Sequence, residues 1–483
     1  GGEGWETGNS HTYNFKGANI VTEVTKHVEI KSRATISGGQ GSGGTCMVRP
    51  AATSSTSDEA VTAAGILGDL KTAFDAVKPS GMTVTVVGTS IHVKHTSAFN
   101  ITTPEPQLLS VTTGSANTVG DLPKNCRHNF VVKIANSSEL EDDFYLKFQV
   151  NNVAASETAD RFGLGVWEEC PKPDLEIKFD DTTMPIKLVR ENPGNTYANG
   201  RFLVQYPSWE DRIVGDDITN PKPTFVGYKI NKLVFFRNRL VVLSEENCIG
   251  SATNDFFNFW SHTAQAVNDD DPIDLQSSST FPTTLFDAIE VNSGLLLFSS
   301  NQQFMLTTDS DAFTPKTAKI NYLSAYNFNH LTKPFSLGIT SGFINSTGKN
   351  ARFYEMADVR REGEPTILEQ SKVISKLLPI DINQVAASKE NGVILFGSAG
   401  KSEIWGYRYF NTEAKRVQSA WFRWTVPGDL TYHTIMDDVY YLILKNGTNY
   451  TLEGIDVKQQ DDTYTVGTAP EEYPVHLDTH TTV

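Results

Sequence analysis

Residues 206–275 read YPSWEDRIVGDDITNPKPTFVGYKINKLVFFRNRLVVLSEENCIGSATNDFFNFWSHTAQAVNDDDPIDL. The first part is rich in Asp, Asn, Gly and Pro, which is turn chemistry, because Asx side chains bond their own backbone and proline presets φ. That composition excludes a helix there. The stretch then alternates apolar runs with polar turns, so it predicts short strand pairs held between loops.

A hairpin is predicted at KINKLVFFRNRLVVLS, residues 229–244. Two apolar runs rich in β-branched and aromatic residues flank Arg237, Asn238 and Arg239, which we interpret as a three-residue polar turn. A further strand is expected at 248–251.

An aromatic cluster follows at residues 255–260, DFFNFW. Phe256, Phe257 and Phe259, together with Trp209, carry enough apolar area to seal one element against the next. We therefore expect residues 206–275 to form a structural corner between an N-terminal domain and a β domain, with these four side chains substantially buried.

The corner is also acidic, and its carboxylates could either bind a metal ion or form ion pairs with arginines. Asp271 and Asp274 lie close together across Pro272 and could supply oxygen ligands to a hard cation such as calcium. The spacing of an EF-hand is absent, however, and acidic turns are commonly solvated or paired with arginine. We expect no bound metal or other cofactor.

The arginines of FFRNRL are the candidate partners for such ion pairs. A guanidinium is planar and matches a carboxylate bidentately, so we expect Arg237 or Arg239 to pair with an acidic turn. Arg212 is a further candidate, and the alternative is a pair of solvated hairpin arginines. The candidate acceptors are Asp216, Asp217, Asp271 and Asp274. The full set of structural or interface candidates is Trp209, Asp211, Arg212, Asp216, Asp217, Arg237, Arg239, Phe256, Phe257, Phe259, Asp271 and Asp274.

The order of seven motifs in this stretch, WEDR, GDD, TNPKP, FFRNRL, EEN, DFFNF and DDDPID, resembles the tail nozzle proteins, or tail tubular proteins B, of short-tailed bacteriophages. The resemblance is strongest over 184–317 and continues more weakly from 31 to 456. The chain starts without Met, and the N-terminal and tip sections of the family are not recognised in it, so we expect a fragment or a processed chain.

The resemblance implies a structural virion protein of the tail, made in the host cytoplasm. It implies a homohexamer that forms the distal tube, passes genomic DNA without sequence-specific binding, and docks to a tail adaptor ring and tail fibres. The distal end would contact the host envelope. The alternative is a β-propeller that binds or degrades host polysaccharide.

A mainly β fold is expected, a β-propeller-like domain with a small α+β domain inserted near the N-terminus. Residues 1–27 are predicted to be an arm or loop, and 28–183 the α+β domain, which the resemblance makes a docking platform. Its helix is predicted at 56–78, capped by Thr56 and Glu59, with Ile66, Leu70, Phe74 and Val77 on one face. That face is predicted to pack on one sheet formed by 82–88, 90–96, 128–135 and 143–150.

After residue 184 the pattern is almost wholly β. Apolar runs recur at intervals of about 40 to 57 residues, which is the period of propeller blades, so 184–456 is predicted to be propeller-like. A pair of β-sandwiches is the second choice. Residues 457–483 are predicted to be a C-terminal strand or the start of a tip region. Aromatic side chains between 405 and 424 are expected to pack between blades rather than form a sugar platform.

Composition excludes several function classes. The net charge of −16 argues against a surface that binds nucleic acid, although it is compatible with DNA passing through. Four scattered cysteines without a C-x-x-C pair predict reduced thiols. The glycines of SGGQGSGG (37–44) and GSAGKS (397–402) are predicted to form turns, because the spacing of a phosphate loop is missing. Neither H-E-x-x-H nor G-x-S-x-G occurs, and no persuasive carboxylate pair is found, so we expect no enzyme.

Overall fold

The computed structural model describes residues 10–15, 28–34, 44–48, 63–97, 99–102, 109–135, 143–151, 161–190, 202–279, 281–310, 312–360, 363–412, 416–457, 465–466 and 469–470. The predicted cap residues Thr56 and Glu59, residues 37–43 of the SGGQGSGG turn and most of the predicted arm lie outside these ranges. The chain divides into two compact units. Unit 1 comprises residues 1–223 and 251–272, and unit 2 comprises 224–250 and 273–483.

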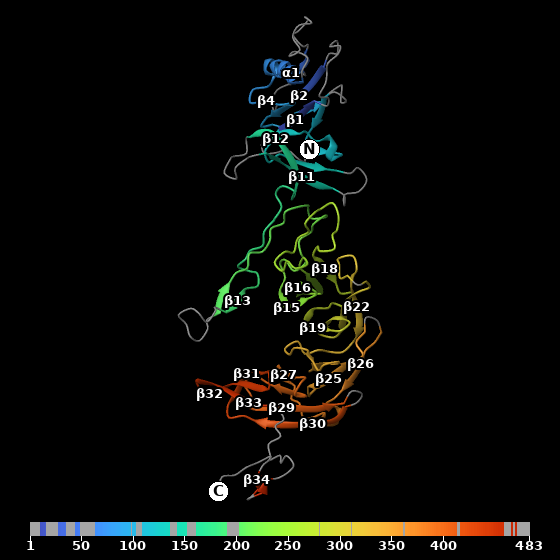
Figure 1. Ribbon diagram of the computed structural model, residues 1–483, viewed down its shortest axis with the longest axis vertical. Coiled ribbons are helices and arrows are strands. Elements are labelled where there is room, and N and C mark those ends of the chain that lie inside the picture. The colour runs from blue at the N-terminus through green and yellow to red at the C-terminus, as the bar shows by residue number, and fades with distance from the viewer. Residues whose placement is uncertain are drawn as a thin grey trace. The chain divides into compact units, whose positions relative to one another are not determined.

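In its described residues, unit 1 combines an α-helix, α1 (Ala63–Val77), with several small sheets, antiparallel apart from the parallel pair of β8 and β10 (Figure 1). Its strands are β1 (Ser10–Phe15), β2 (Val28–Ala34), β3 (Gly44–Val48), β4 (Thr83–Val87), β5 (Ser90–Lys94), β6 (Phe99–Thr102), β7 (Leu109–Thr112), β8 (Ser115–Ala116), β9 (Asn125–Arg127), β10 (Val131–Ile134), β11 (Phe144–Val150), β12 (Phe162–Cys170), β13 (Lys187–Arg190) and β14 (Phe202–Gln205). They pair in the orders β4-β5-β1-β7, β3-β2-β6, β8-β10-β11-β12-β9 and β13-β14.

The helix packs through Leu67, Leu70 and Phe74, which share a core with residues of β4, β5 and β6. The predicted apolar face is thus correct for Leu70 and Phe74. It is wrong for Val77, which is 54% exposed because it is the last residue of the helix. The single predicted sheet is also wrong. β4 and β5 belong to one sheet and β10 and β11 to another, since β1 takes the free edge of β5.

Unit 2 is a succession of antiparallel meanders, each built from strands in chain order (Figure 1). The first four have four strands: β15 (Ile230–Phe236), β16 (Arg239–Ser244), β17 (Asn247–Gly250) and β18 (Ile273–Gln276); β19 (Leu285–Val291), β20 (Gly294–Ser299), β21 (Gln303–Thr308) and β22 (Ala318–Ser324); β23 (Phe335–Ser336), β24 (Ser341–Asn345), β25 (Arg352–Ala357) and β26 (Thr366–Glu369); β27 (Gln384–Ser388), β28 (Val393–Gly397), β29 (Glu403–Asn411) and β30 (Arg416–Thr425). Then come β31 (Asp429–Met436), β32 (Val439–Asn446) and β33 (Asn449–Asp456), followed by a short pair, β34 (Thr465–Val466) and β35 (Ala469–Pro470).

The meanders stack face to face, as the alternating directions of the β20 side chains show. All six of its residues are buried. Leu295 and Leu297 belong to a core shared with β16 and β17, whereas Leu296 and Phe298 belong to a core shared with β24 and β25. Successive side chains of a strand point to opposite faces, so each face of this sheet meets a different neighbour. A continuous apolar run, rather than an alternating one, is therefore the sequence signal of an inner propeller sheet.

Strand β28 repeats this arrangement two meanders later. Ile394 and Phe396 join residues of β24 and β25, and Val393 and Leu395 join residues of β32. Burying such side chains contributes about 1.5–3 kcal/mol each, so the interfaces between meanders carry much of the stability of unit 2. Strand order and stacking confirm the propeller-like β domain.

The aromatic residues between 405 and 424 lie at these interfaces. Trp405, Tyr407 and Tyr409 are buried in the core between the third and fourth meanders, and Trp421 packs against it. Packing between blades is thus confirmed. The GSAGKS segment connects β28 to β29 as a turn with Gly400 at a φ of 78°, which confirms the turn and leaves no helix to face a phosphate.

The described cysteines are buried free thiols: Cys126, Cys170 and Cys248. Burial raises the pKa of Cys170 to about 11 and raises that of Cys248 as well, so both thiols stay protonated. The reduced state of these thiols stays a prediction. In the part of the chain that the structure describes, no helix has the length and apolar character to cross a membrane.

Candidate functional site

Loops 206–223 and 251–272 of the predicted corner lie in unit 1 and meet there, whereas residues 224–250 and 273–275 belong to unit 2. That the stretch joins an N-terminal domain to the β domain stays a prediction. The centre of the corner is aromatic. Trp209 is 7% exposed and packs edge-on against Phe257, with ring centroids 5.3 Å apart, and against Phe259 at 6.0 Å. Trp260 stacks on Phe179 at 5.2 Å. The predicted burial is confirmed for Trp209 and Phe259, whereas Phe256 and Phe257 are only half-buried.

Arg212 is the arginine that this corner buries. Its side chain is fully enclosed, and its guanidinium carbon lies 5.3 Å from the centre of the Trp260 ring. Both Nη atoms donate to one carboxylate oxygen of Asp217, at 3.1 and 3.2 Å. The backbone N–H of Arg212 donates to the carbonyl of Ile177 at 2.8 Å. The Trp260 ring and the Asp217 carboxylate together hold the Arg212 side chain in place. Arg212 thereby stabilises the conformation of loop 206–223.

Asp216 and Asn220 organise the same loop. Asp216 accepts hydrogen bonds from the backbone of Ile218 and Thr219. Burial acts to raise the pKa of Asp216, but those hydrogen bonds outweigh it and the pKa is lowered. Asn220 is 2% exposed, donates to the carbonyl of Val214 and accepts from the backbone N–H of Ser261. Asn220 thereby joins the two loops.

The remaining predicted carboxylates also bind protein groups. Asp271 is 2% exposed and accepts from the backbone N–H groups of His262 and Asn268, so it closes the second loop upon itself. Asp211 forms an exposed ion pair with Lys178 at 2.8 Å. Across the described ranges, no group of three or more His, Cys, Asp and Glu side chains is arranged to hold a metal ion.

The FFRNRL hairpin lies in unit 2 and differs from the prediction in its turn. Arg237 and Asn238 alone form the turn, with φ values of 49° and 58°, the left-handed conformation that two-residue hairpins require. Arg239 is the first residue of β16, pairs with Phe236 in the ladder and is fully buried. The three-residue turn was wrong because the strand register begins one residue earlier.

The predicted arginine–carboxylate pair has a different outcome for each residue. Arg237 is exposed and lies over the ring of Phe236, and the described residues give it no ion pair with a carboxylate. Pairing of Arg239 with an acidic turn stays a prediction. Asp274, in the same unit, accepts from the backbone N–H and hydroxyl of Thr224, at 2.8 and 2.7 Å.

Glu169, at the end of β12, is a corner residue that sequence reasoning missed. Its carboxylate accepts from the Thr263 hydroxyl at 2.8 Å and from the backbone N–H of Ala264 at 3.0 Å, and Gln265 also donates to it. These contacts fasten the sheet of β12 to loop 251–272. No local signal could have found them, since the partners are more than ninety residues apart in the chain.

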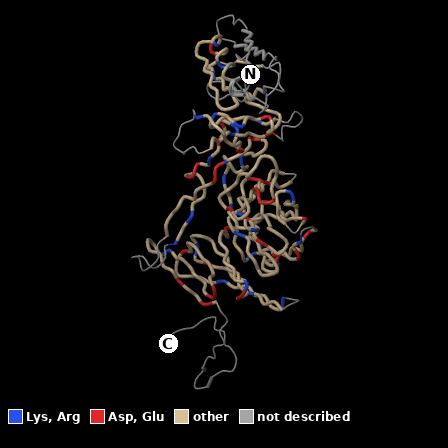
Figure 2. Tube along the Cα trace, turned by 45° about the horizontal axis from the view of Figure 1, so that its top comes forward, with Lys and Arg blue, Asp and Glu red and all other residues tan. Residues whose placement is uncertain are grey.

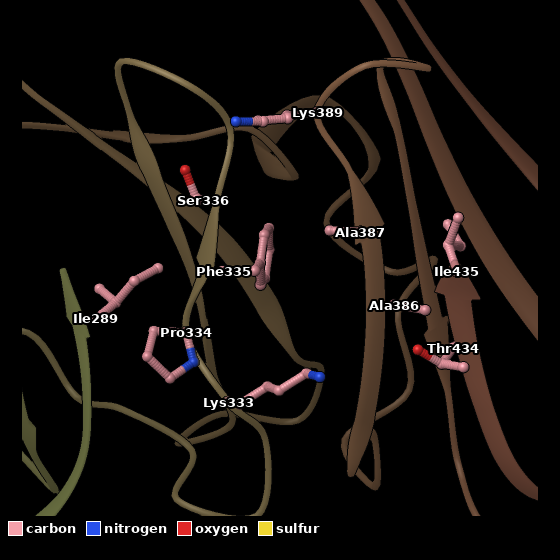
Figure 3. A pocket seen from close by; sticks show the side chains of 10 residues that line it. All are labelled: Ile289, Lys333, Pro334, Phe335, Ser336, Ala386, Ala387, Lys389, Thr434 and Ile435. Atoms are coloured by element: carbon pink, nitrogen blue, oxygen red, sulfur yellow. The ribbon is translucent and has the colours of Figure 1, made fainter. Parts of the chain in front are cut away.

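Unit 2 contains a pocket of about 370 Å³ (Figure 3). Its lining comes largely from β19, β23, β27 and β31, the first strands of four successive meanders, which are the strands that surround the axis of a propeller. Lys333 and Lys389 lie on either side of Phe335 (Figure 3). The lining residues are Ile289, Lys333, Pro334, Phe335, Ser336, Ala386, Ala387, Lys389, Thr434 and Ile435.

The fold and the corner define a structural class of protein: a chain with a propeller-like stack of β-meanders and an α+β domain, in which buried polar residues such as Asn220 hold loops to one another. Residues 6–483 match the family model described as bacteriophage nozzle protein. The chain belongs to that family and is a structural component of the tail of a phage virion.

Among curated proteins, the tail tubular protein gp12 of Escherichia phage T7 is 29% identical over 357 residues. The aligned part covers 72% of this chain and 42% of that relative, so the chain spans less than half of the relative's length.

Solved structures give only weak likenesses. A protein described as a 6-phosphogluconolactonase from Bacteroides uniformis is 12% identical, with 66% of this chain and 92% of that chain covered and a TM-score of 0.31. Kluyveromyces lactis Hsv2 is 10% identical, with coverages of 48% and 62% and a TM-score of 0.29. Scores this low carry no argument, and the fold rests on the strand order and packing described above.

Proposed function

We propose that the protein forms the wall of the nozzle, the distal tube of a short phage tail, with several copies around a channel for DNA. The match to the nozzle family along residues 6–483 carries this proposal. Six copies are expected. The protein then acts as a structural element and catalyses no reaction.

Charge is the second support. Six copies at −16 each would carry −96, and a channel wall with net negative charge repels phosphates, which keeps a moving duplex from binding. Figure 2 shows acidic and basic positions interspersed along the described chain.

We assign a different role in the nozzle to each of the two units. In the proposal, the stacked meanders of unit 2 build the tube, and unit 1 is a platform that meets the adaptor ring or the tail fibres. The rigid corner of Trp209, Arg212 and Glu169 would hold the loops of that platform in place. The distal end would contact the host envelope.

Electron microscopy and mass photometry of the purified protein test the proposal. Rings of uniform size with a central channel are expected, and labelling of the protein in intact particles should place it at the tail. A protein that stays monomeric at micromolar concentration and is found outside the tail would overturn it. Clearing of a capsule lawn by such a monomer would favour the polysaccharide alternative.

A further inference from the structure

The last meander of unit 2 offers an open edge. Within the described residues it has three strands, β31-β32-β33, whereas each of the four meanders before it has four. All eight residues of the edge strand β33 are exposed, including Tyr450 at 60% and Leu452 at 69%. The outer side of an edge strand presents backbone donors and acceptors that template the addition of another strand.

A second incomplete element lies in unit 1. β13 and β14 form a sheet of only two strands in the described chain, and Leu188, Phe202 and Val204 are 62%, 64% and 59% exposed. A two-stranded ribbon is marginally stable in water, and it gains stability when further strands or a packed face complete it. In the part of the chain that the structure describes, the last meander thus ends in an exposed edge strand, and the sheet of β13 and β14 has no further strand.

The charges of the two strands are complementary and fit in register. β13 carries Lys187 and Arg190, and β33 carries Glu453 and Asp456. Both pairs are three residues apart, so one antiparallel register places Arg190 opposite Glu453 and Lys187 opposite Asp456. Opposite charges that face each other across strands stabilise the pairing. β14 contains no charged residue, which selects β13 as the added strand.

The same register brings apolar side chains together, because it places Leu188 of β13 opposite Ile455 of β33. Ile455 is 37% exposed and Leu188 is 62% exposed, so both have apolar surface to bury. Neither Arg190 nor Glu453 forms an ion pair among the described residues. The same antiparallel register of β13 and β33 therefore satisfies the charged pairs and the apolar pair.

We propose that β13 of one copy adds to β33 of the neighbouring copy and completes its last meander. This inference rests on the proposed function, in which several copies form a ring. A contact between two different surfaces of identical subunits is heterologous, and its repetition forms a ring when the rotation from one copy to the next closes on itself. The pairing of β13 with β33 then links adjacent subunits of the nozzle wall.

Disulfide trapping tests the register directly. In the protein carrying Leu188→Cys and Ile455→Cys, the two cysteines lie directly opposite each other, within reach of a disulfide. Under oxidising conditions a covalent ladder of subunits is expected on a non-reducing gel. Leu188→Cys with Leu452→Cys is the matched control, because a shift of three residues separates the positions by about 10 Å, which is too far.

The outcomes separate the two proposals. Rings that form without cross-linking of the 188/455 variant would overturn the strand exchange and leave the nozzle proposal standing. A fast-migrating, internally cross-linked monomer would show that β13 completes its own chain, which overturns the exchange between copies. Unmodified protein that never forms rings would overturn the nozzle proposal itself.

A charge swap provides a second test. Arg190→Glu or Glu453→Arg alone is expected to raise the concentration needed for ring assembly about fivefold, and the double variant is expected to restore it. Lys372→Glu, at an exposed position of unit 2, is the control for the change in net charge. Failure of the double variant to recover assembly would contradict the register.

Discussion

The carboxylate of Glu355 accepts hydrogen bonds from both Nη groups of Arg416, which lies 61 residues further along the chain. Glu355 belongs to β25 and Arg416 to β30, so the ion pair joins the third meander to the fourth. The Glu355 side chain is 8% exposed and that of Arg416 is 20% exposed. The guanidinium also lies over Tyr409, at 4.8 Å from the ring centre.

Glu355→Gln is therefore expected to lower the free energy of unfolding by about 3 kcal/mol, since removal of one partner leaves a largely buried charge without compensation. Urea denaturation measures the loss. Glu403→Gln breaks the exposed pair with Arg423 and should cost less than about 1 kcal/mol. Equal losses for the two variants would refute this prediction.

The corner makes a prediction about two phenylalanines of one motif. Phe259→Ala is expected to cost about 3–5 kcal/mol because Phe259 is 3% exposed and packs against Trp209. Phe257→Ala should cost clearly less, since Phe257 is half-buried. Thermal unfolding of both variants is the measurement, and a larger loss for Phe257→Ala would contradict the arrangement of the corner.

His433 predicts a dependence of stability on pH. Burial is the main cause that lowers its pKa to about 4, and its Nδ1 lies 2.7 Å from the Tyr440 hydroxyl. The folded protein keeps this imidazole neutral, whereas the unfolded chain protonates it below about pH 6.5. The stability contributed by the neutral ring is thus present above pH 6.5 and is lost as the pH falls towards 4, by about 3 kcal/mol in all.

His433→Gln retains a side-chain acceptor for Tyr440 and has no proton to gain. The difference in unfolding free energy between this variant and the unmodified protein should therefore shrink between pH 7 and pH 4.5. His330→Gln, at an exposed histidine, serves as the control for the substitution of histidine by glutamine. Parallel profiles for His433→Gln and the unmodified protein would exclude the role of the buried ring.

The assembled ring is expected to bind duplex DNA weakly even at low salt. Each copy has a net charge of −16, and binding that depends on counterion release needs clustered basic residues. Fluorescence anisotropy of a labelled duplex at several salt concentrations is the measurement. Micromolar, steeply salt-dependent binding to the ring would refute a low-friction channel.

Local patterns in the sequence predicted the meanders of unit 2, since turns and strands depend on near neighbours. The run LVFFRNRLVVL predicted a hairpin, and the regular recurrence of apolar runs predicted propeller-like units. The motif order also indicated the family before any contact was known. The burial predicted for the aromatic cluster is correct for Trp209 and Phe259 and wrong for Phe256 and Phe257, which are half-buried.

Only the tertiary structure decided which sheet each strand joins and which charge meets which. β5 pairs with β1 across nearly eighty residues, Glu169 meets Thr263, and Glu355 meets Arg416, and none of these partners carries a local signature. The sequence also did not predict that Arg212 is buried in the aromatic corner, whereas Arg237 of the hairpin turn is exposed. A side chain's environment depends on the segments that fold against it, because burial and pairing energies arise between elements that are distant in the chain.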